Sequence, residues 1–190
     1  MLRPLILAST SPRRQSLLAE LGIPFTISAP TLEQETLDPA LPLAEALEHL
    51  ALEKARSVAR DNPHALVLGA DTIVCKDGAL LGKPRDAAQM LRTLSGAEHQ
   101  VITAVALTCA ESQKSITRHA QSSVHFRTLS EQEIQDYIAS REPLDKAGAY
   151  GIQGQGGKFV EKLQGPYDNV VGLPLDLVRQ MLAEWEEEDQ

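Results

Sequence analysis

Two short, fully apolar runs constrain the fold of this 190-residue chain more than any other feature. Residues 5–8 read Leu-Ile-Leu-Ala, and residues 65–70 read Ala-Leu-Val-Leu-Gly-Ala. A strand that is buried on both faces needs apolar side chains on both, whereas a strand with one wet face alternates between apolar and polar residues. Both runs are therefore predicted to be buried strands of an α/β protein.

Helical segments alternate with these strands. Ser11 is a good N-cap, Pro12 suits the first helical position, and Gly22 is a good stop, so a helix is predicted between them. Apolar residues at helical spacing predict a longer helix over residues 43–60. Three further helices are predicted by capping residues and a helix-opening proline, over residues 87–95, 131–140 and 175–186.

Residues 99–109 and 115–126 predict a β-hairpin, because apolar and polar side chains alternate along them. A hairpin is antiparallel, so the sheet is predicted to be mixed and twisted, with flanking helices. The length predicts one domain over residues 1–190, or one domain with two lobes.

The formal net charge is −8, but it is unevenly distributed. Five acidic residues lie in the last seven positions, 184–190, which leaves 18 basic against 21 acidic residues elsewhere, or −3. This segment is interpreted as an acidic tail. The rest of the chain is nearly neutral, which argues against nucleic acid as a partner but not against a local basic pocket.

Cysteine usage and hydropathy point to the cytoplasm. Cys75 and Cys109 are the only cysteines, and their spacing gives neither a zinc pattern nor a disulfide framework. No apolar run approaches the length of a membrane span, and the short apolar run at the N-terminus precedes its paired arginines instead of following them, unlike a secretory signal. We therefore expect a cytoplasmic protein with no membrane partner.

The start of the first predicted helix is a candidate phosphate site. Ser9, Arg13 and Arg14 lie around a helix N-terminus, where free N–H groups and the helix dipole favour an anion. Two arginines there oppose the dipole unless an anion is bound, and arginine binds phosphate bidentately. The alternative is a capped helix with solvated arginines.

Asp71 follows the second apolar run directly, so it is predicted to lie at a strand end, where active sites of α/β proteins gather. Its carboxylate is a candidate general base or metal ligand; the alternative is an aspartate that caps a turn. Lys83, in Gly-Lys-Pro-Arg-Asp, is a candidate for phosphate contact. Lys54 lies on the helix predicted over residues 43–60, beside a glutamate, in a pattern that is usually a solvated face.

Residues 143–157 are predicted to be a glycine-rich loop, and residues 145–154 within it are a candidate ligand-binding segment. Its glycines permit close approach of the backbone to a ligand, and Gln153 offers a donor and an acceptor that suit the edge of a base. The alternative is an ordinary turn-rich loop.

These pieces together resemble the Maf family of nucleoside triphosphate pyrophosphatases. The matching segments come in the family's order and span nearly the whole chain. They are LILASTSPRRQSLL (5–18), LALEKA (50–55), VLGADTIV (67–74), LGKPRD (81–86), LSGAEHQVITAVAL (94–107), DKAGAYGIQG (145–154) and VVGLPL (170–175).

The resemblance implies two lobes around a cleft, as in inosine triphosphate pyrophosphatases, and a homodimer. It implies hydrolysis of a nucleoside triphosphate to the monophosphate and pyrophosphate, with a divalent cation, Mg²⁺ or Mn²⁺. DKAGAYGIQG resembles the branch that acts on dTTP and UTP. The alternatives are the branch that prefers 7-methyl-GTP and a non-catalytic, nucleotide-binding regulator of septum formation.

The resemblance also implies roles for single residues. Asp71 matches the family's proton acceptor, and the other matches are substrate-binding positions: Ser9, Arg13, Arg14, Lys54, Thr72, Lys83 and Gln153. Glu33 and Asp71 are the implied metal ligands. Many members carry a second acid after Glu33, where this chain has Gln34, and a one-residue shift would let Glu35 serve instead. An amide binds a divalent cation less well than a carboxylate.

Overall fold

The computed structural model describes residues 3–82 and 85–188. The described chain divides into two compact units, which agrees with the expectation of two lobes. Unit 1 comprises residues 3–71, 103–120 and 172–188, and unit 2 comprises residues 72–82, 85–102 and 121–171. In the described part of the chain, no helix is both long and apolar enough to cross a lipid bilayer.

The strands form a mixed sheet, as predicted. Over the described residues it has seven strands in the order β2-β1-β3-β5-β6-β7, with β4 paired to β3. β1 pairs in parallel with β2 and β3, whereas β4 and β7 pair antiparallel with β3 and β6. The strands are β1 (Leu5–Ala8), β2 (Phe25–Ser28), β3 (Leu66–Lys76), β4 (Ala79–Leu81), β5 (Glu98–Cys109), β6 (Lys114–Phe126) and β7 (Val160–Gln164).

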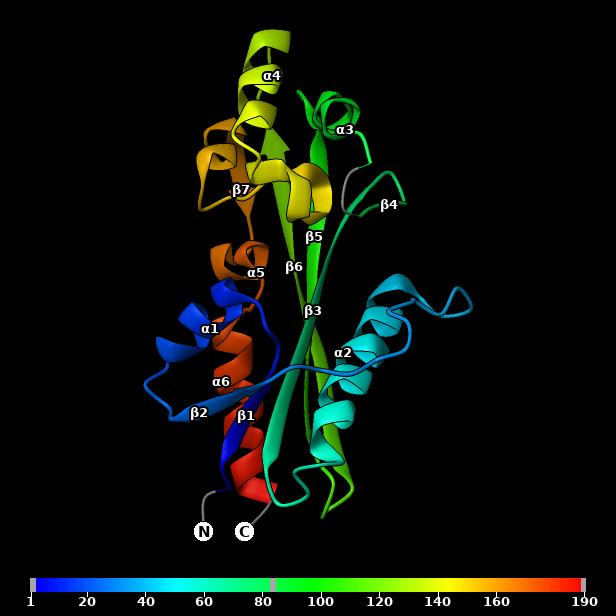
Figure 1. The fold of residues 1–190 in the computed structure, drawn as a ribbon, viewed down its shortest axis with the longest axis vertical. Coiled ribbons are helices and arrows are strands. Elements are labelled where there is room, and N and C mark those ends of the chain that lie inside the picture. The colour runs from blue at the N-terminus through cyan, green and yellow to red at the C-terminus, as the bar shows by residue number, and fades with distance from the viewer. Residues whose placement is uncertain (1–2, 83–84, 189–190) are drawn as a thin grey trace. The chain divides into compact units, whose positions relative to one another are not determined.

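Unit 1 contains three helices, α1 (Pro12–Ala19), α2 (Leu43–Ala59) and α6 (Leu175–Glu188). Ser11 caps α1 by accepting a hydrogen bond from the Arg14 N–H, and Pro12 occupies the first turn, as predicted. α2 runs along β3 and buries one apolar face, including Leu47 and Leu50 (Figure 1). The helix predicted from the spacing of apolar residues over residues 43–60 is therefore confirmed.

The expected acidic tail is largely the last part of α6. Trp185 is only 2% exposed, so the segment packs against unit 1. Glu184 and Glu188 pair with Arg118 and Lys114 of β6, and the Lys114 Nζ lies 4.4 Å from the centre of the Trp185 ring. Residues 184–188 of the acidic segment belong to α6, where one buried tryptophan and two basic partners hold them.

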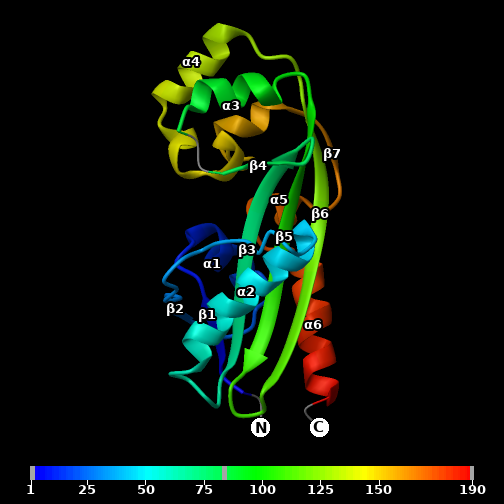
Figure 2. The same ribbon diagram turned by 90° about the vertical axis from the view of Figure 1, so that its right-hand side faces the viewer.

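Unit 2 contains three α-helices and three 3₁₀ turns. α3 and α4 lie side by side (Figure 2). The helices are α3 (Ala87–Leu94), α4 (Glu131–Ala139) and α5 (Tyr167–Val171), and the turns are η1 (Glu142–Asp145), η2 (Ala147–Ala149) and η3 (Gln155–Phe159). Asp86 and Ser130 cap α3 and α4, as predicted. α5 was not predicted, because five residues are too few to show a helical period.

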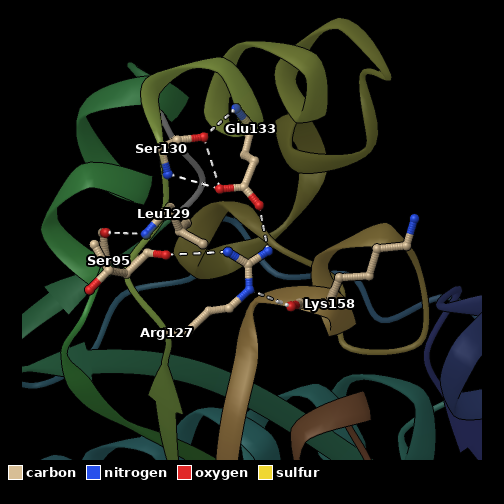
Figure 3. A network of polar contacts seen from close by, with 7 residues as sticks. Ser95, Arg127, Leu129, Ser130, Glu133 and Lys158 are labelled. Atoms are coloured by element: carbon tan, nitrogen blue, oxygen red, sulfur yellow. Dashed lines mark hydrogen bonds and ion pairs between the residues drawn. The ribbon is translucent and has the colours of Figure 1, made fainter.

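Arg127 ties three segments of unit 2 together (Figure 3). Its guanidinium donates to the Glu133 carboxylate at 2.6 Å and to the Lys158 carbonyl at 3.1 Å. Glu133 completes the capping box with Ser130 at the start of α4. These hydrogen bonds lower the pKa of Glu133 to about 2, with Arg127 as the largest cause. The end of β6, the start of α4 and the end of η3 are thereby joined.

His99 lies in the aromatic core of unit 2. Its ring packs edge-on against Phe126 and Tyr150, and its Nε2 is 2.8 Å from the Tyr150 hydroxyl. Its Nδ1 is buried and has no hydrogen-bond partner within the described part of the chain. Burial, followed by the nearby charges of His125 and Lys76, lowers the pKa of His99 to about 4. His99 is therefore neutral in the folded protein at pH 7.

We expect this histidine to make unit 2 sensitive to acid. Below the ordinary pKa of 6.5, the unfolded chain binds a proton at His99 that the folded chain does not accept until about pH 4. The free energy of unfolding should therefore fall by about 2 kcal/mol between pH 7 and pH 5 through this one group. Urea unfolding at both pH values would measure the loss.

His99→Gln keeps a donor for Tyr150 but removes the titration, so this component of the pH dependence should disappear. His49→Gln is the matched control, because it replaces an exposed imidazole by the same amide. If the free energy of unfolding falls equally between pH 7 and pH 5 in wild type and in His99→Gln, the assignment of this pH dependence to His99 is contradicted.

Candidate active site

Lys54 joins two carboxylates in unit 1. Its Nζ donates to Asp71 Oδ1 at 2.6 Å and to Glu35 Oε2 at 2.8 Å. The Lys54 residue is 6% exposed, whereas the side chains of Asp71 and Glu35 are 17% and 58% exposed. The solvated helix face that the sequence pattern usually indicates is therefore not found at Lys54. A buried ammonium with two carboxylate partners is instead typical of a functional or structural ion cluster.

Gly69 explains why Lys54 reaches Asp71. A Cβ at Gly69 would lie 2.4 Å from the Ala51 carbonyl oxygen and 2.9 Å from the Ala55 Cβ. The absence of a side chain on β3 lets the α2 backbone pack directly against the strand. Lys54 lies between Ala51 and Ala55 on α2, and Asp71 lies two residues beyond Gly69 on β3.

The segment that carries Glu35 is held to the same helix. Ser57 of α2 accepts a hydrogen bond from the Thr31 N–H at 3.1 Å and donates one to the Lys54 carbonyl at 2.8 Å. This attachment fixes the start of the connection between β2 and α2, four residues before Glu35. The cluster is therefore assembled from one helix, one strand and one connection.

Asp71 does not lie at the end of its own strand, contrary to the prediction. β3 continues to Lys76, because its last residues pair with β4 after the Asp77-Gly78 turn. The neighbouring strand β1 ends at Ala8, which is paired with Gly69. Asp71 thus lies just past the carboxyl end of β1, the edge at which ligands bind in parallel sheets.

Thr72 is the next residue of β3 and belongs to unit 2. Successive side chains of a strand point to opposite faces, so Thr72 and Asp71 face opposite sides of β3. The sequence alone had placed both residues in one motif without this distinction.

The start of α1 adds charge to the cluster. Burial lowers the pKa of Arg14, Arg13 lowers it further, and the carboxylates of Asp71 and Glu35 oppose the shift. Arg14 therefore shares an electrostatic environment with the Lys54 cluster. Its Nε donates to the Gly172 carbonyl at 2.9 Å, which orients the guanidinium.

Arg13 and Ser9 differ in exposure. Arg13 is exposed, whereas Ser9 is 5% exposed and its hydroxyl accepts a hydrogen bond from the Ser11 N–H at 3.2 Å. Ser9 thus supports the turn between β1 and α1, in addition to any contact with a ligand.

The second carboxylate in the Lys54 cluster is Glu35, whereas the family resemblance implied Glu33 as a metal ligand, with Glu35 as the alternative. Glu33 is exposed and has no ion pair within residues 3–82 and 85–188, and Gln34 is exposed as well. In the sequence, Glu35 appeared only as a second acidic residue two positions after Glu33. A connection without regular structure has no helical or strand period from which to predict which side chain contacts Lys54.

The oxygen donors suit a hard divalent cation only in part. No group of three or more histidine, cysteine or acidic residues that could hold a metal occurs among the described residues. Asp71 and Glu35 nevertheless provide two carboxylates on one ammonium, and Mg²⁺ is commonly bound by one or two carboxylates plus substrate phosphates. The donor set therefore fits a cation that arrives with a phosphate ligand.

Gln153 and Lys83 complete the predicted site residues. Gln153 belongs to unit 2, is exposed, and its side chain has no hydrogen-bond partner within the described part of the chain. Lys83 lies outside the described residues. Ser9, Arg13, Arg14, Lys54 and Asp71 all belong to unit 1.

The comparison with protein families is decisive. A family model described as "Maf-like protein" matches residues 4–185. The chain belongs to the Maf family. The match covers the whole cluster in unit 1 and the glycine-rich segment in unit 2, so the family resemblance of the sequence motifs is confirmed.

Several relatives of this Maf chain carry one name, "dTTP/UTP pyrophosphatase". The protein of Symbiobacterium thermophilum is 48% identical over 97% of this chain and 95% of its own length. Those of Moorella thermoacetica and Escherichia coli are both 52% identical, over 94% of this chain and 93% and 91% of their own lengths. These matches span both units.

Among solved structures, the Maf chain is similar to the Ham1 protein of Staphylococcus aureus. The TM-score is 0.42 with 8% sequence identity, over 65% of this chain and 72% of that one. A similarity of this extent adds nothing to the family assignment.

The role of Gly69 can be tested by stability. Gly69→Ala places a methyl group against the α2 backbone, and overpacking of this kind costs about 1–3 kcal/mol. Gly82→Ala is the matched control, because a Cβ there would have no neighbour within 4 Å among the described residues, and it should leave the free energy of unfolding unchanged or slightly higher. Urea unfolding would measure both, and equal effects would contradict the close packing of α2 on β3.

Proposed function

We propose that this Maf protein is a pyrophosphatase that hydrolyses dTTP and UTP to the nucleoside monophosphate and pyrophosphate. The observation that carries the proposal is the buried Lys54 bonded to the partly exposed Asp71 carboxylate, beside Arg14. This arrangement combines cationic side chains that can bind a polyphosphate with a carboxylate that can accept a proton from water. The names of relatives that are about half identical over nearly the whole chain support the same reaction and substrates.

In this proposal, arginine and lysine side chains hold the triphosphate. Arg13 and Arg14 lie in the first turn of α1, where backbone N–H groups and the helix dipole also favour anions. Lys54 contributes a point charge, and Lys83 is assigned the same role from the family resemblance. Binding and charge neutralisation by such groups account for most of the catalysis in phosphoryl chemistry.

Asp71 is assigned the role of general base. Lys54 donates to Asp71 Oδ1, and Oδ2 has no hydrogen-bond partner in the part of the chain that the structure describes. Oδ2 accepts a proton from a water molecule whose oxygen attacks the α-phosphorus. The bond from that phosphorus to the oxygen bridging it to the β-phosphorus breaks, and pyrophosphate leaves with that oxygen.

We further propose that Asp71 and Glu35 hold a divalent cation, Mg²⁺ or Mn²⁺, with Glu33 as the alternative second ligand. When bound, such a cation neutralises charge on the phosphate oxygens. Lys54 keeps the two carboxylates close together before the nucleotide and its cation arrive, which reduces the reorganisation that binding requires.

Substrate choice is assigned to Gln153, Thr72 and Arg13. The Gln153 amide matches the O4 and N3–H groups of thymine and uracil, and Thr72 and Arg13 are the other family positions tied to substrate choice. The relatives named for dTTP and UTP favour this branch over 7-methyl-GTP. A non-catalytic regulator would bind a nucleotide without releasing pyrophosphate.

We also propose that residues 1–190 act as one Maf domain, since the family model spans residues 4–185. A homodimer and a cytoplasmic location complete the proposal. Cys75 and Cys109 are both buried and unpaired with each other, which suits a reducing compartment.

Asp71→Asn should abolish most turnover. The amide keeps the shape and an acceptor for Lys54 but cannot take a proton from water, so kcat for dTTP should fall by about 10²–10⁴-fold. Asp77→Asn is the matched control, because Asp77 is an exposed turn residue with positive φ, a conformation that asparagine tolerates. Pyrophosphate release with Mn²⁺ would measure both, and wild-type rates in Asp71→Asn would refute the assignment of the base.

The second metal ligand can be identified by titration with Mn²⁺. Glu35→Gln should raise the Mn²⁺ concentration needed for half-maximal activity by about tenfold, because a carboxylate is replaced by a weaker neutral ligand. Glu33→Gln should leave that concentration unchanged. The opposite ranking would assign the ligand to Glu33 and leave Glu35 as a partner of Lys54 only.

A further inference from the structure

Glu142 inserts its carboxylate into the glycine-rich segment of unit 2. Its Oε1 accepts from the Tyr137 hydroxyl at 2.9 Å and from the Gly156 N–H at 3.3 Å, and its Oε2 accepts from the Gln155 N–H at 3.0 Å. The Tyr137 hydroxyl in turn accepts from the Gly151 N–H at 3.1 Å. The Glu142 carboxylate thus binds the backbone just after Gln153, and its partner Tyr137 binds the backbone just before Gln153.

The glycines of this segment make room for that carboxylate. A Cβ at Gly154 would lie 2.2 Å from Glu142 Oε1, and a Cβ at Gly156 would lie 2.7 Å from the Tyr137 hydroxyl oxygen. At Gly151 a Cβ would lie 3.2 Å from Glu142 Oε1. The sequence pattern suggested glycines that admit a ligand. In the structure these three positions admit a side chain of the protein itself.

The same segment is held at both ends. Tyr150 is bonded to the buried His99 before it, and Arg127 binds the Lys158 carbonyl after it (Figure 3). Gln153 lies between these anchors and is exposed. A residue that must present an amide to one edge of a base gains selectivity only when its backbone is fixed.

The Glu142 carboxylate remains ionised at neutral pH. Burial raises its pKa, but the hydrogen bonds from the Gln155 N–H, the Tyr137 hydroxyl and the Gly156 N–H outweigh burial and lower it. Hydrogen bonds from neutral donors to a charged acceptor are stronger than those between neutral groups. The contact is thus strong enough to hold the turn at residues 151–157.

We propose that Glu142 is a positioning residue for base selectivity, which fixes the turn that presents Gln153 to the base of the nucleotide. This inference rests on the proposed function and deepens it, since it adds a residue that touches no substrate. Glu142 acts through the backbone at residues 155 and 156 and through Tyr137.

The test compares Glu142→Gln with Gln153→Ala, using pyrophosphate release from dTTP, UTP, dCTP and dATP. The amide of Glu142→Gln turns a donor toward a backbone N–H, so the turn should loosen without a change in side-chain size. We expect KM for dTTP and UTP to rise about tenfold, kcat to stay within threefold, and the preference for dTTP over dATP in kcat/KM to fall about tenfold. These magnitudes correspond to the loss of one well-oriented hydrogen bond.

The double variant Glu142→Gln, Gln153→Ala separates positioning from a general loss of stability. If Glu142 acts through Gln153, the double variant should have the same dTTP preference as Gln153→Ala alone. Glu161→Gln is the matched control, because Glu161 is an exposed carboxylate on β7 of the same unit and should change neither KM nor preference. Amide hydrogen exchange at Gln155 and Gly156 should be faster in Glu142→Gln than in wild type.

The outcomes distinguish this inference from the proposed function. Wild-type protein that releases no pyrophosphate from any nucleotide overturns both. Wild-type turnover with an unchanged dTTP preference in folded Glu142→Gln overturns only the role of Glu142, as do fully additive effects in the double variant. If Glu142→Gln does not fold, Tyr137→Phe removes one hydroxyl from the same network and should lower the preference by a smaller factor; an unchanged preference there overturns the inference.

Discussion

The direct packing of α2 on β3 at Gly69 is the constraint on which the cluster in unit 1 depends. The helix can approach the strand only because no Cβ stands between Gly69 and the Ala51 carbonyl. That approach takes Lys54 out of water, and a buried ammonium is stable only beside partners such as Asp71. The pairing of Lys54 with the Asp71 carboxylate thus depends on a contact between backbones.

A similar solution occurs in unit 2, with the charges reversed. There the charge is the partly exposed Glu142 carboxylate, and glycines again remove the side chains that would block it. Backbone N–H groups satisfy Glu142, whereas two carboxylates satisfy Lys54. In both places hydrogen bonds orient a charged side chain, and hydrogen bonds to charged groups are stronger than those between neutral groups.

Net charge gives little information about such clusters. The protein has a formal charge of −8, yet Arg13, Arg14 and Lys54 lie in one unit with Asp71. Two of the acids near the C-terminus are paired with Arg118 and Lys114, so part of the negative charge is neutralised locally. Short-range pairing decides the local field because exposed charges more than about 8–10 Å apart are largely screened at physiological salt.

The sequence by itself determined the class of the fold, the order of most of its helices and longer strands, and the family. Apolar runs, helical periods and the caps at Ser11, Asp86 and Ser130 are local signals, and the structure confirms them. The motif residues of the family likewise follow one another along the chain. Such features depend only on residues that are close in the chain, so they can be predicted without knowledge of the tertiary contacts.

Only the tertiary structure decided which residues meet. It continued β3 past Asp71, brought Glu35 and not Glu33 to Lys54, packed Trp185 into unit 1, and gave the glycines around Gln153 an internal partner in Glu142. Each of these depends on a pairing between residues distant in the chain or on a connection without regular structure. Neither a long-range pairing nor an irregular connection produces a periodic pattern in the sequence. The position of each contacting residue is set by packing and by the cost of unpaired polar groups.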